Sequence, residues 1–161
     1  MAWYDEAVFY HIYPLGLTGA PKQNSYGEPV HRLNTILPWI SHIKEIGCNA
    51  IYIGPLFESV GHGYETTDYK KLDSRLGTNE DLTNFVELCH KAGIRVILDG
   101  VFNHTGRDFF AFQDIKNSAC QRTHFGKNFL RNSCLTATTL QHFPIKEQSG
   151  QVHIISLNPS L

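Results

Sequence analysis

The sequence predicts an α/β fold: an incomplete TIM-type (β/α) barrel, with about the first three β-α units, followed by an irregular tail. Three short runs at 7–13, 50–53 and 94–98 are rich in the β-branched and aromatic residues that favour strands. They begin about 42 to 45 residues apart, and the stretches between them show helical apolar periodicity. This order is typical of parallel strands joined by right-handed crossovers. A complete eight-fold barrel needs about 250 residues, more than the 161 of this chain.

The first predicted strand is 7–13. Pro14 ends it, because proline lacks the N–H donor that pairing in a sheet requires. Residues 16–34 are dense in Gly, Pro, Asn and Ser and predict a long irregular excursion at one end of the sheet.

Two amphipathic helices are predicted between the strands. The first begins after Asn34 or Thr35, either of which can cap it, and ends before Gly47. The second begins at Thr78-Asn-Glu-Asp81, which resembles a capping box, and ends before Gly93. Each helix has an apolar face that packs on the sheet, formed by Ile36, Leu37, Ile40 and Ile43 in the first and by Leu82, Phe85, Val86 and Cys89 in the second.

A doubly wound nucleotide-binding sheet has the same order of strands and helices. It needs a glycine-rich phosphate turn directly after the first strand, whereas Gly16 and Gly19 lie in the long excursion. The Gly61-His-Gly63 segment has Thr66 where a third glycine would be needed. The barrel is therefore the preferred fold.

Polar residues follow the third predicted strand directly, namely Asp99, Asn103 and His104. In barrels of this type, the carboxyl ends of the strands and the loops after them form the active face, so these side chains would lie where a substrate binds. The plainer interpretation is that Asp99 and Asn103 form a turn and that His104 is a hydrogen-bonded histidine near the surface. The residues alone leave both interpretations open.

Three motifs resemble those of the α-amylase superfamily, glycoside hydrolase family 13. Asp99-Gly-Val-Phe-Asn103-His104 is similar to that family's Asp-Val-Val-x-Asn-His region, with Gly100 as the one departure. Residues 47–59 resemble its second strand and the loop after it. Residues 62–69 are similar to its His-Gly-Tyr-Asp-x-x-Asp-Tyr motif, with Glu65 in place of the first aspartate. The motifs occur in the family's order, and the resemblance covers about residues 7 to 115.

The resemblance implies that His62, Tyr64 and His104 bind substrate. Tyr64 matches a tyrosine that forms a stacking platform for a sugar ring, and His62 and His104 match donors to sugar hydroxyls. Asp99 is expected to be a supporting, orienting carboxylate rather than a catalyst. Asn103 matches an asparagine that contributes an oxygen to a structural calcium in many members, so calcium is the one cofactor expected. Without the resemblance, the tyrosine would be a packing aromatic and the histidines hydrogen-bonded structural residues.

The chemistry that the resemblance implies is retaining glycoside hydrolysis, which needs a nucleophilic carboxylate and an acid/base carboxyl about 5 to 5.5 Å apart. By resemblance, the nucleophile should lie in a Gly-x-Arg-x-Asp segment ending a fourth strand, and the acid Glu after a fifth. No such segment follows Ile115. Asp108 and Asp114 are the nearest carboxylates and are predicted to be solvated side chains. We therefore expect this chain to contain no catalytic residue and to lack hydrolase activity by itself.

The composition changes after residue 116. Residues 1–116, predicted to be the N-terminal portion of the barrel, carry 10 basic and 14 acidic residues, whereas 117–161 carry four basic residues and one acidic residue. The tail, 117–161, shows no sustained period, and 151–155 is its only strand-like piece. We interpret this tail as irregular and as an out-of-frame product of a frameshift; a specialised C-terminal module is the alternative.

The net charge and the hydropathy indicate which binding partners and which cellular location to expect. A net charge of -1 and a pI near 6.7 indicate neither nucleic acid nor an anionic membrane as a partner. No apolar stretch approaches the roughly 20 residues of a membrane span, and no basic leader precedes an apolar segment, so a cytoplasmic location is expected. No two cysteines have C-x-x-C spacing, which predicts neither a zinc site nor a redox pair among Cys48, Cys89, Cys120 and Cys134.

Two functions remain. The first is an α-amylase-type hydrolase, or related transglycosylase, that acts on α-glucans or maltooligosaccharides, with this chain as its N-terminal part. The second is a non-catalytic remnant that binds sugar weakly through Tyr64, His62 and His104. No oligomeric state is predicted.

Overall fold

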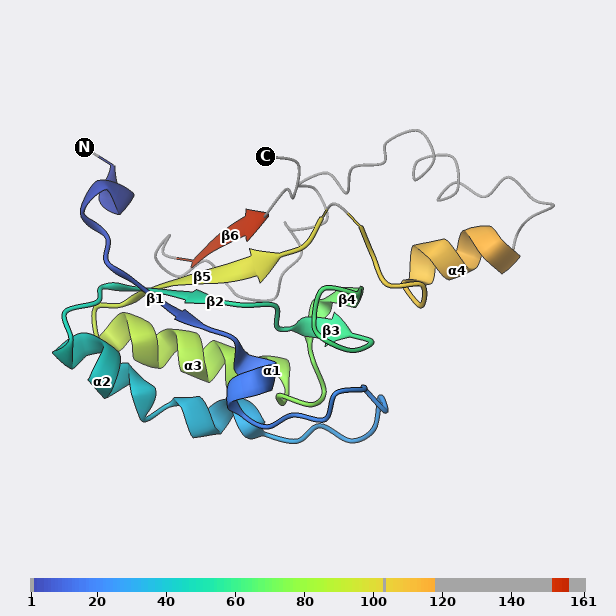
Figure 1. Ribbon diagram of the computed structural model, residues 1–161, viewed down its shortest axis with the longest axis horizontal. Coiled ribbons are helices and arrows are strands. Elements are labelled where there is room, and N and C mark those ends of the chain that lie inside the picture. The colour runs from blue at the N-terminus through green and yellow to red at the C-terminus, as the bar shows by residue number, and fades with distance from the viewer. Residues whose placement is uncertain (1, 103, 118–151, 157–161) are drawn as a thin grey trace.

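The computed structural model describes residues 2–102, 104–117 and 152–156. Its centre is a four-stranded parallel sheet in the order β1 (Phe9–Ile12), β2 (Ala50–Ile53), β5 (Arg95–Gly100) and β6 (Val152–Ser156) (Figure 1). Within this sheet, neighbouring strands follow one another in sequence order. In a doubly wound sheet the strand order reverses at a switch point, so the observed order confirms the barrel-type prediction.

The helices between the strands cover one face of the sheet. Figure 1 shows α2 (Trp39–Glu45) and α3 (Asn79–Lys91) beneath the same face. Alternate residues of each strand point toward them, as the two-residue period of a strand requires. The resulting core consists of fully or almost fully buried apolar side chains, including Ile12, Ile51, Ile53, Val96 and Leu98 from the strands and Ile40, Ile43, Leu82, Phe85 and Val86 from the helices.

The start of α3 matches the prediction. Thr78 is its N-cap, and its backbone N–H donates to the Asp81 carboxylate at 2.8 Å, while Thr78 Oγ1 accepts from the Asp81 N–H at 3.4 Å. Beyond the helix end, Gly93 has a φ of +80°, which an L side chain rarely adopts. Local sequence alone specifies both ends of this helix.

The predicted start of α2 was wrong. Neither Asn34 nor Thr35 caps it; both lie in the preceding 3₁₀ helix η2 (Arg32–Ile36), and Pro38 takes the N-cap position without a side-chain bond. The Asn34 amide instead donates to Asp81 at 3.1 Å, and the Thr35 hydroxyl donates to the Arg32 carbonyl at 2.7 Å. These tertiary and local bonds compete with the capping role.

The segment after β2 is more regular than the predicted loop. It contains a two-stranded antiparallel sheet of β3 (Phe57–Ser59) and β4 (Thr66–Leu72), and the turn between them carries His62 and Tyr64. Figure 1 shows this pair beyond the carboxyl ends of the parallel strands. These two strands show no apolar alternation in the sequence, because several of their buried residues are polar, namely Glu58, Ser59, Thr66 and Thr67.

The remaining described elements are short. The N-terminal 3₁₀ helix η1 (Trp3–Glu6) precedes β1, and α1 (Pro14–Leu17) opens the predicted excursion. After β5 comes α4 (Phe110–Asn117). Of the predicted tail, the strand-like piece at 151–155 corresponds to β6, which pairs in parallel with β5. The prediction for the rest of 118–161 lies outside the described residues.

Candidate functional site

One face of the parallel sheet carries polar and aromatic side chains near the carboxyl ends of its strands. The register aligns His11 of β1 with Tyr52 of β2, and Tyr52 with Ile97 of β5. Asp99 is two residues further along β5 and therefore lies on the same face. The rings of His11 and Tyr52 pack with their centroids 5.0 Å apart. The face opposite α2 and α3 thus gathers three polar side chains from three strands.

Asp99 is a buried carboxyl group without hydrogen-bond partners for either oxygen within the described part of the chain. Burial raises the pKa of Asp99, and the neighbouring Tyr52 hydroxyl and His11 offset this effect in part. Burial also raises the pKa of Tyr52, and the nearby Asp99 charge raises it further. Asp99 therefore stands at the strand tip, as predicted, and it retains unused hydrogen-bonding capacity on the site face.

His62 and Tyr64 lie together on the turn between β3 and β4. Their ring centroids are 5.7 Å apart, and His62 Nε2 lies 2.8 Å from the Glu65 carboxylate. Burial raises the pKa of Tyr64, and the charges of Asp99 and Tyr13 raise it further. The hydroxyl of Tyr13, which directly follows β1, donates to the His62 carbonyl and so joins this turn to the end of a parallel strand. Because the Tyr64 side chain is still 38% exposed, it offers ring surface to a ligand.

Gly63 allows the turn to hold these two side chains. Its φ is +103°, and a Cβ at this position would lie 2.7 Å from Cγ of Pro55. A side chain here would therefore be strained by the backbone and would also collide with the proline ring. The Gly-Pro segment after β2 and the turn at His62–Tyr64 are packed directly on one another.

The segment after β5 approaches the same turn. The Gly106 N–H donates to the Thr66 carbonyl at 2.8 Å, and a Cβ on Gly106 would lie 2.6 Å from the Glu65 carbonyl oxygen. The Tyr69 hydroxyl contacts the carbonyls of Val101 and His104. His104 itself is exposed beside this contact. The structure thus brings the segments bearing His104 and Tyr64 together, as the two motifs imply.

Sequence reasoning missed three residues of this site, namely His11, Tyr13 and Tyr52. His11 has no metal-ligand spacing to other histidines in the sequence, and it is exposed, but its ring also packs against Tyr52 on the site face. The two-residue strand period offered a signal, because His11 and Tyr52 occupy the same position relative to the ends of their strands. That signal needs the register between the strands.

The structure does not test the expected calcium site. Asn103, the predicted ligand, lies outside the described residues, and the part of the chain that is described contains no group of three His, Cys, Asp or Glu side chains able to hold a metal ion. In the same residues, no helix has both the length and the apolar character required to cross a bilayer.

The described face and the neighbouring turn offer aromatic surface and polar groups to a ligand. They combine exposed aromatic surface with imidazoles and a carboxyl group, which match the apolar faces and hydroxyl edges of a sugar ring. Retaining hydrolysis needs two carboxylates, and the described strands β1, β2 and β5 place only Asp99 on this face.

Comparison with known proteins agrees with the fold and the motifs. A family model described as the α-amylase catalytic domain matches residues 21–144, more than half of the chain. The chain belongs to the α-amylase family. A cyclomaltodextrinase from Thermoanaerobacter pseudethanolicus is 38% identical to this family member over 127 residues, which cover 70% of the chain and 22% of the enzyme. Neopullulanase 2 from Thermoactinomyces vulgaris is 30% identical over 157 residues, covering 88% and 27%.

Solved structures of the α-amylase family show the same likeness. The cyclic α-maltosyl-(1→6)-maltose hydrolase from Arthrobacter globiformis, in its ligand-free form, superposes with a TM-score of 0.60 at 33% identity, covering 73% of this chain and 30% of that one. The chain spans about a quarter of the length of the curated relatives it matches.

The comparisons correct the extent of the resemblance. The resemblance seen in the sequence ends near residue 115, whereas the family model matches to residue 144. The interpretation of the tail as out of frame depended on the resemblance ending near Lys116, and the match to residue 144 removes that reason.

Proposed function

We propose that this chain forms the first part of the catalytic barrel of a glycoside hydrolase that acts on α-glucans or maltooligosaccharides. In this proposal it supplies sugar-contacting groups, with Tyr64 stacking on a sugar ring and His62 and His104 donating to hydroxyls. The observation that supports the proposal is that the Tyr64 turn is bonded to the residue after β1 and lies against the segment after β5, in a chain whose relatives are α-glucan hydrolases.

The environment of Asp99 indicates which catalytic role this carboxyl group can take. Asp99 is buried and has a raised pKa, so it is poorly suited to act as an ionised nucleophile and better suited to orient a neighbouring group. The nucleophile and the acid would come from strands later in the barrel. We therefore propose that the 161-residue chain binds oligosaccharide weakly and does not hydrolyse it.

A titration tests this proposal. The full chain should bind maltoheptaose measurably, bind β-linked cellohexaose less tightly, and release no reducing ends from maltoheptaose. Hydrolysis that is abolished by mutating one of the chain's own residues would overturn the inactive assignment. Equal affinity for the two oligosaccharides, or none for either, would overturn the α-glucan assignment.

The coding DNA tests the proposed origin of the tail. If the frameshift interpretation is right, another reading frame downstream of the Lys116 codon should encode a Gly-x-Arg-x-Asp segment. If no frame encodes such a segment, the tail is not a frameshift product.

A further inference from the structure

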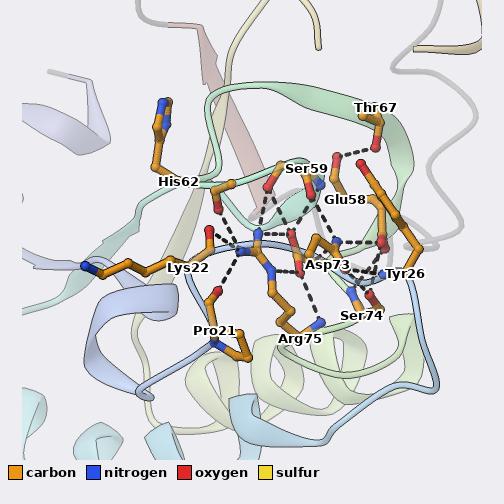
Figure 2. Close-up of polar contacts among 12 residues, drawn as sticks. Pro21, Lys22, Tyr26, Glu58, Ser59, His62, Thr67, Asp73, Ser74 and Arg75 are labelled. Carbon is orange, nitrogen blue, oxygen red and sulfur yellow. Dashed lines mark hydrogen bonds and ion pairs between the residues drawn. The ribbon is translucent and has the colours of Figure 1, made fainter. Parts of the chain in front are cut away.

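A buried polar cluster lies beneath the turn that carries His62 and Tyr64 (Figure 2). Its centre is the ion pair of Arg75 and Asp73, whose side chains are 5% and 0% exposed. The Arg75 Nε and Nη2 atoms donate to the two carboxylate oxygens of Asp73 at 2.8 and 2.7 Å. This is the two-pronged geometry that a planar guanidinium makes with a carboxylate.

The remaining donors of Arg75 bind two irregular segments. Nη1 donates to the carbonyl of Gly61 at 2.7 Å and to that of Pro21 at 2.9 Å, and Nη2 also donates to Ser59 Oγ at 3.0 Å. Gly61 directly precedes His62, and Pro21 belongs to the excursion after α1. One side chain therefore ties the start of the turn to the excursion and to the end of β3.

Asp73 fixes the other side of the arrangement. Its carboxylate accepts from the backbone N–H of Ser59 at 3.2 Å and from the Ser59 hydroxyl at 3.0 Å. Ser59 is the last residue of β3, so the anchor of Arg75 is itself held by a strand. The turn then closes through the Val60 N–H, which donates to the Glu65 carbonyl at 3.3 Å.

The cluster does not face the proposed sugar site. Figure 2 shows the His62 side chain pointing away from Arg75. Arg75 is almost fully buried, so a ligand cannot reach its guanidinium. Any influence of Arg75 on ligand binding must therefore pass through the backbone of the turn.

Stability by itself is a weak reason for such a cluster. A buried ion pair loses the hydration of both charges and often contributes no more than well-packed apolar side chains of similar volume. Apolar side chains, however, could not bind the carbonyl of Gly61, a buried residue, and this carbonyl would lose its partner. The cluster is suited to fixing the backbone of two segments that lack regular pairing.

We propose that Arg75 is a positioning residue that sets the place of Tyr64 and His62 through the Gly61 carbonyl, with Asp73 as its anchor. This inference rests on the proposed function in one respect, because the positioned residues are those assigned to sugar binding. It adds a specific residue, outside the sugar-facing surface, on which the affinity of the site depends.

Arg75→Lys is the variant of choice. Lysine keeps the positive charge beside Asp73, but one ammonium group cannot replace the guanidinium fork at Asp73 and reach Gly61 and Pro21 together. In full-length chain, the Val60 amide should exchange its hydrogen at least tenfold faster, while amides within α3 and β5 exchange as in the wild type. The affinity for maltoheptaose should fall about tenfold.

A control variant and a chemical rescue distinguish a positioning role of Arg75 from a general loss of stability. Lys71 pairs at 3.2 Å with Glu58, which precedes Ser59 in β3, and no bond within the described part of the chain joins the Lys71 side chain to the turn. Lys71→Gln should therefore leave Val60 exchange and maltoheptaose affinity unchanged. In Arg75→Ala, millimolar guanidinium should restore part of the lost affinity, an effect that a merely destabilised protein would not show.

The outcomes are distinct. Wild-type Val60 exchange in Arg75→Lys would overturn the proposal, as would faster exchange spread equally over α3 and β5. Wild-type affinity together with a loosened turn would also overturn it. If the wild-type chain does not bind maltoheptaose, the proposed function fails, while the exchange of Val60 still decides whether Arg75 holds the turn.

Discussion

The Tyr13 hydroxyl donates to the backbone carbonyl of His62 at 2.9 Å. Tyr13 directly follows β1, and His62 lies on the turn between β3 and β4, so this bond joins the first parallel strand to the proposed sugar-binding turn. It acts from the site side, whereas Arg75 holds the same turn from the buried side. The turn is thus held at two successive carbonyls, those of Gly61 and His62.

Tyr13→Phe tests the contact on the site side. It removes one hydroxyl and leaves the ring, so the free energy of unfolding should fall by about 0.5 to 1.5 kcal/mol, as for an ordinary hydrogen bond. Urea denaturation followed by circular dichroism measures this change. Tyr4→Phe is the control, because Tyr4 is 61% exposed near the N-terminus. Equal losses in the two variants would show that the Tyr13 bond contributes nothing specific.

Tyr64→Ala tests the stacking role. Loss of an aromatic ring from a ligand site costs about 1 kcal/mol, or about fivefold in Kd. His42→Ala is the comparison, because His42 packs against Tyr10 and Trp39 on the helix side, away from the turn. Calorimetric titration with maltoheptaose should show weaker binding for Tyr64→Ala only. The same Kd in both variants would remove Tyr64 from the site.

Asp99 makes stability depend on pH in an unusual direction for a carboxylate. Because burial raises the pKa of Asp99 above its ordinary value of 3.8, the folded chain binds this proton more tightly than the unfolded chain. Its contribution to stability is therefore greatest at pH values below 3.8 and declines as the pH rises from there through the folded pKa. Asp99→Asn, which cannot ionise, should unfold at a higher temperature than the wild type at pH 7.

Thermal unfolding from pH 3 to pH 7 checks this expectation. The difference in melting temperature between Asp99→Asn and the wild type should grow with pH. If the wild type is the more stable protein at pH 7, the Tyr52 hydroxyl and His11 outweigh burial, and the assignment of a raised pKa to Asp99 is wrong.

Asp81 has the opposite linkage. Burial opposes its ionisation, but the hydrogen bonds from the Thr78 N–H, His31 and Asn34 outweigh burial and lower the pKa of Asp81. Its contribution to stability is present above the ordinary value of 3.8 and is lost as the pH falls through the folded pKa. Asp81→Asn should cost about 1.5 to 3 kcal/mol at pH 7, as expected for hydrogen bonds to a charged group.

Urea denaturation at pH 7 and at pH 3 measures this cost, which should shrink at the lower pH. Glu87→Gln is the control, because Glu87 is exposed on α3 and pairs with the exposed Lys91 at 3.8 Å. A cost for Asp81→Asn that is the same at both pH values would mean that charge does not contribute at this position.

Much of the fold could be predicted from local sequence. The strands at 9–12, 50–53 and 95–100 lie in short apolar runs, and burial on the helix-covered face demands that composition. The capping box at Thr78 and the glycine after α3 act within a few residues of each other, so reading the chain suffices to find them. The motifs at His62–Tyr69 and Asp99–His104 were sufficient to indicate the family.

Contacts between distant segments decided the rest. The β3–β4 pair, the η2 helix before α2, the His11–Tyr52 contact and the Arg75 cluster each join residues that no short window contains together. Apolar periodicity in the sequence indicates which side chains are buried. A buried arginine, in contrast, is explained only by the carboxylate and carbonyls that surround it in the fold. The sequence by itself thus determined the strands, the capping of α3 and the family, because these depend on local preferences. Only the tertiary structure decided how the site is held, because strand register and buried hydrogen bonds exist only once the chain is folded.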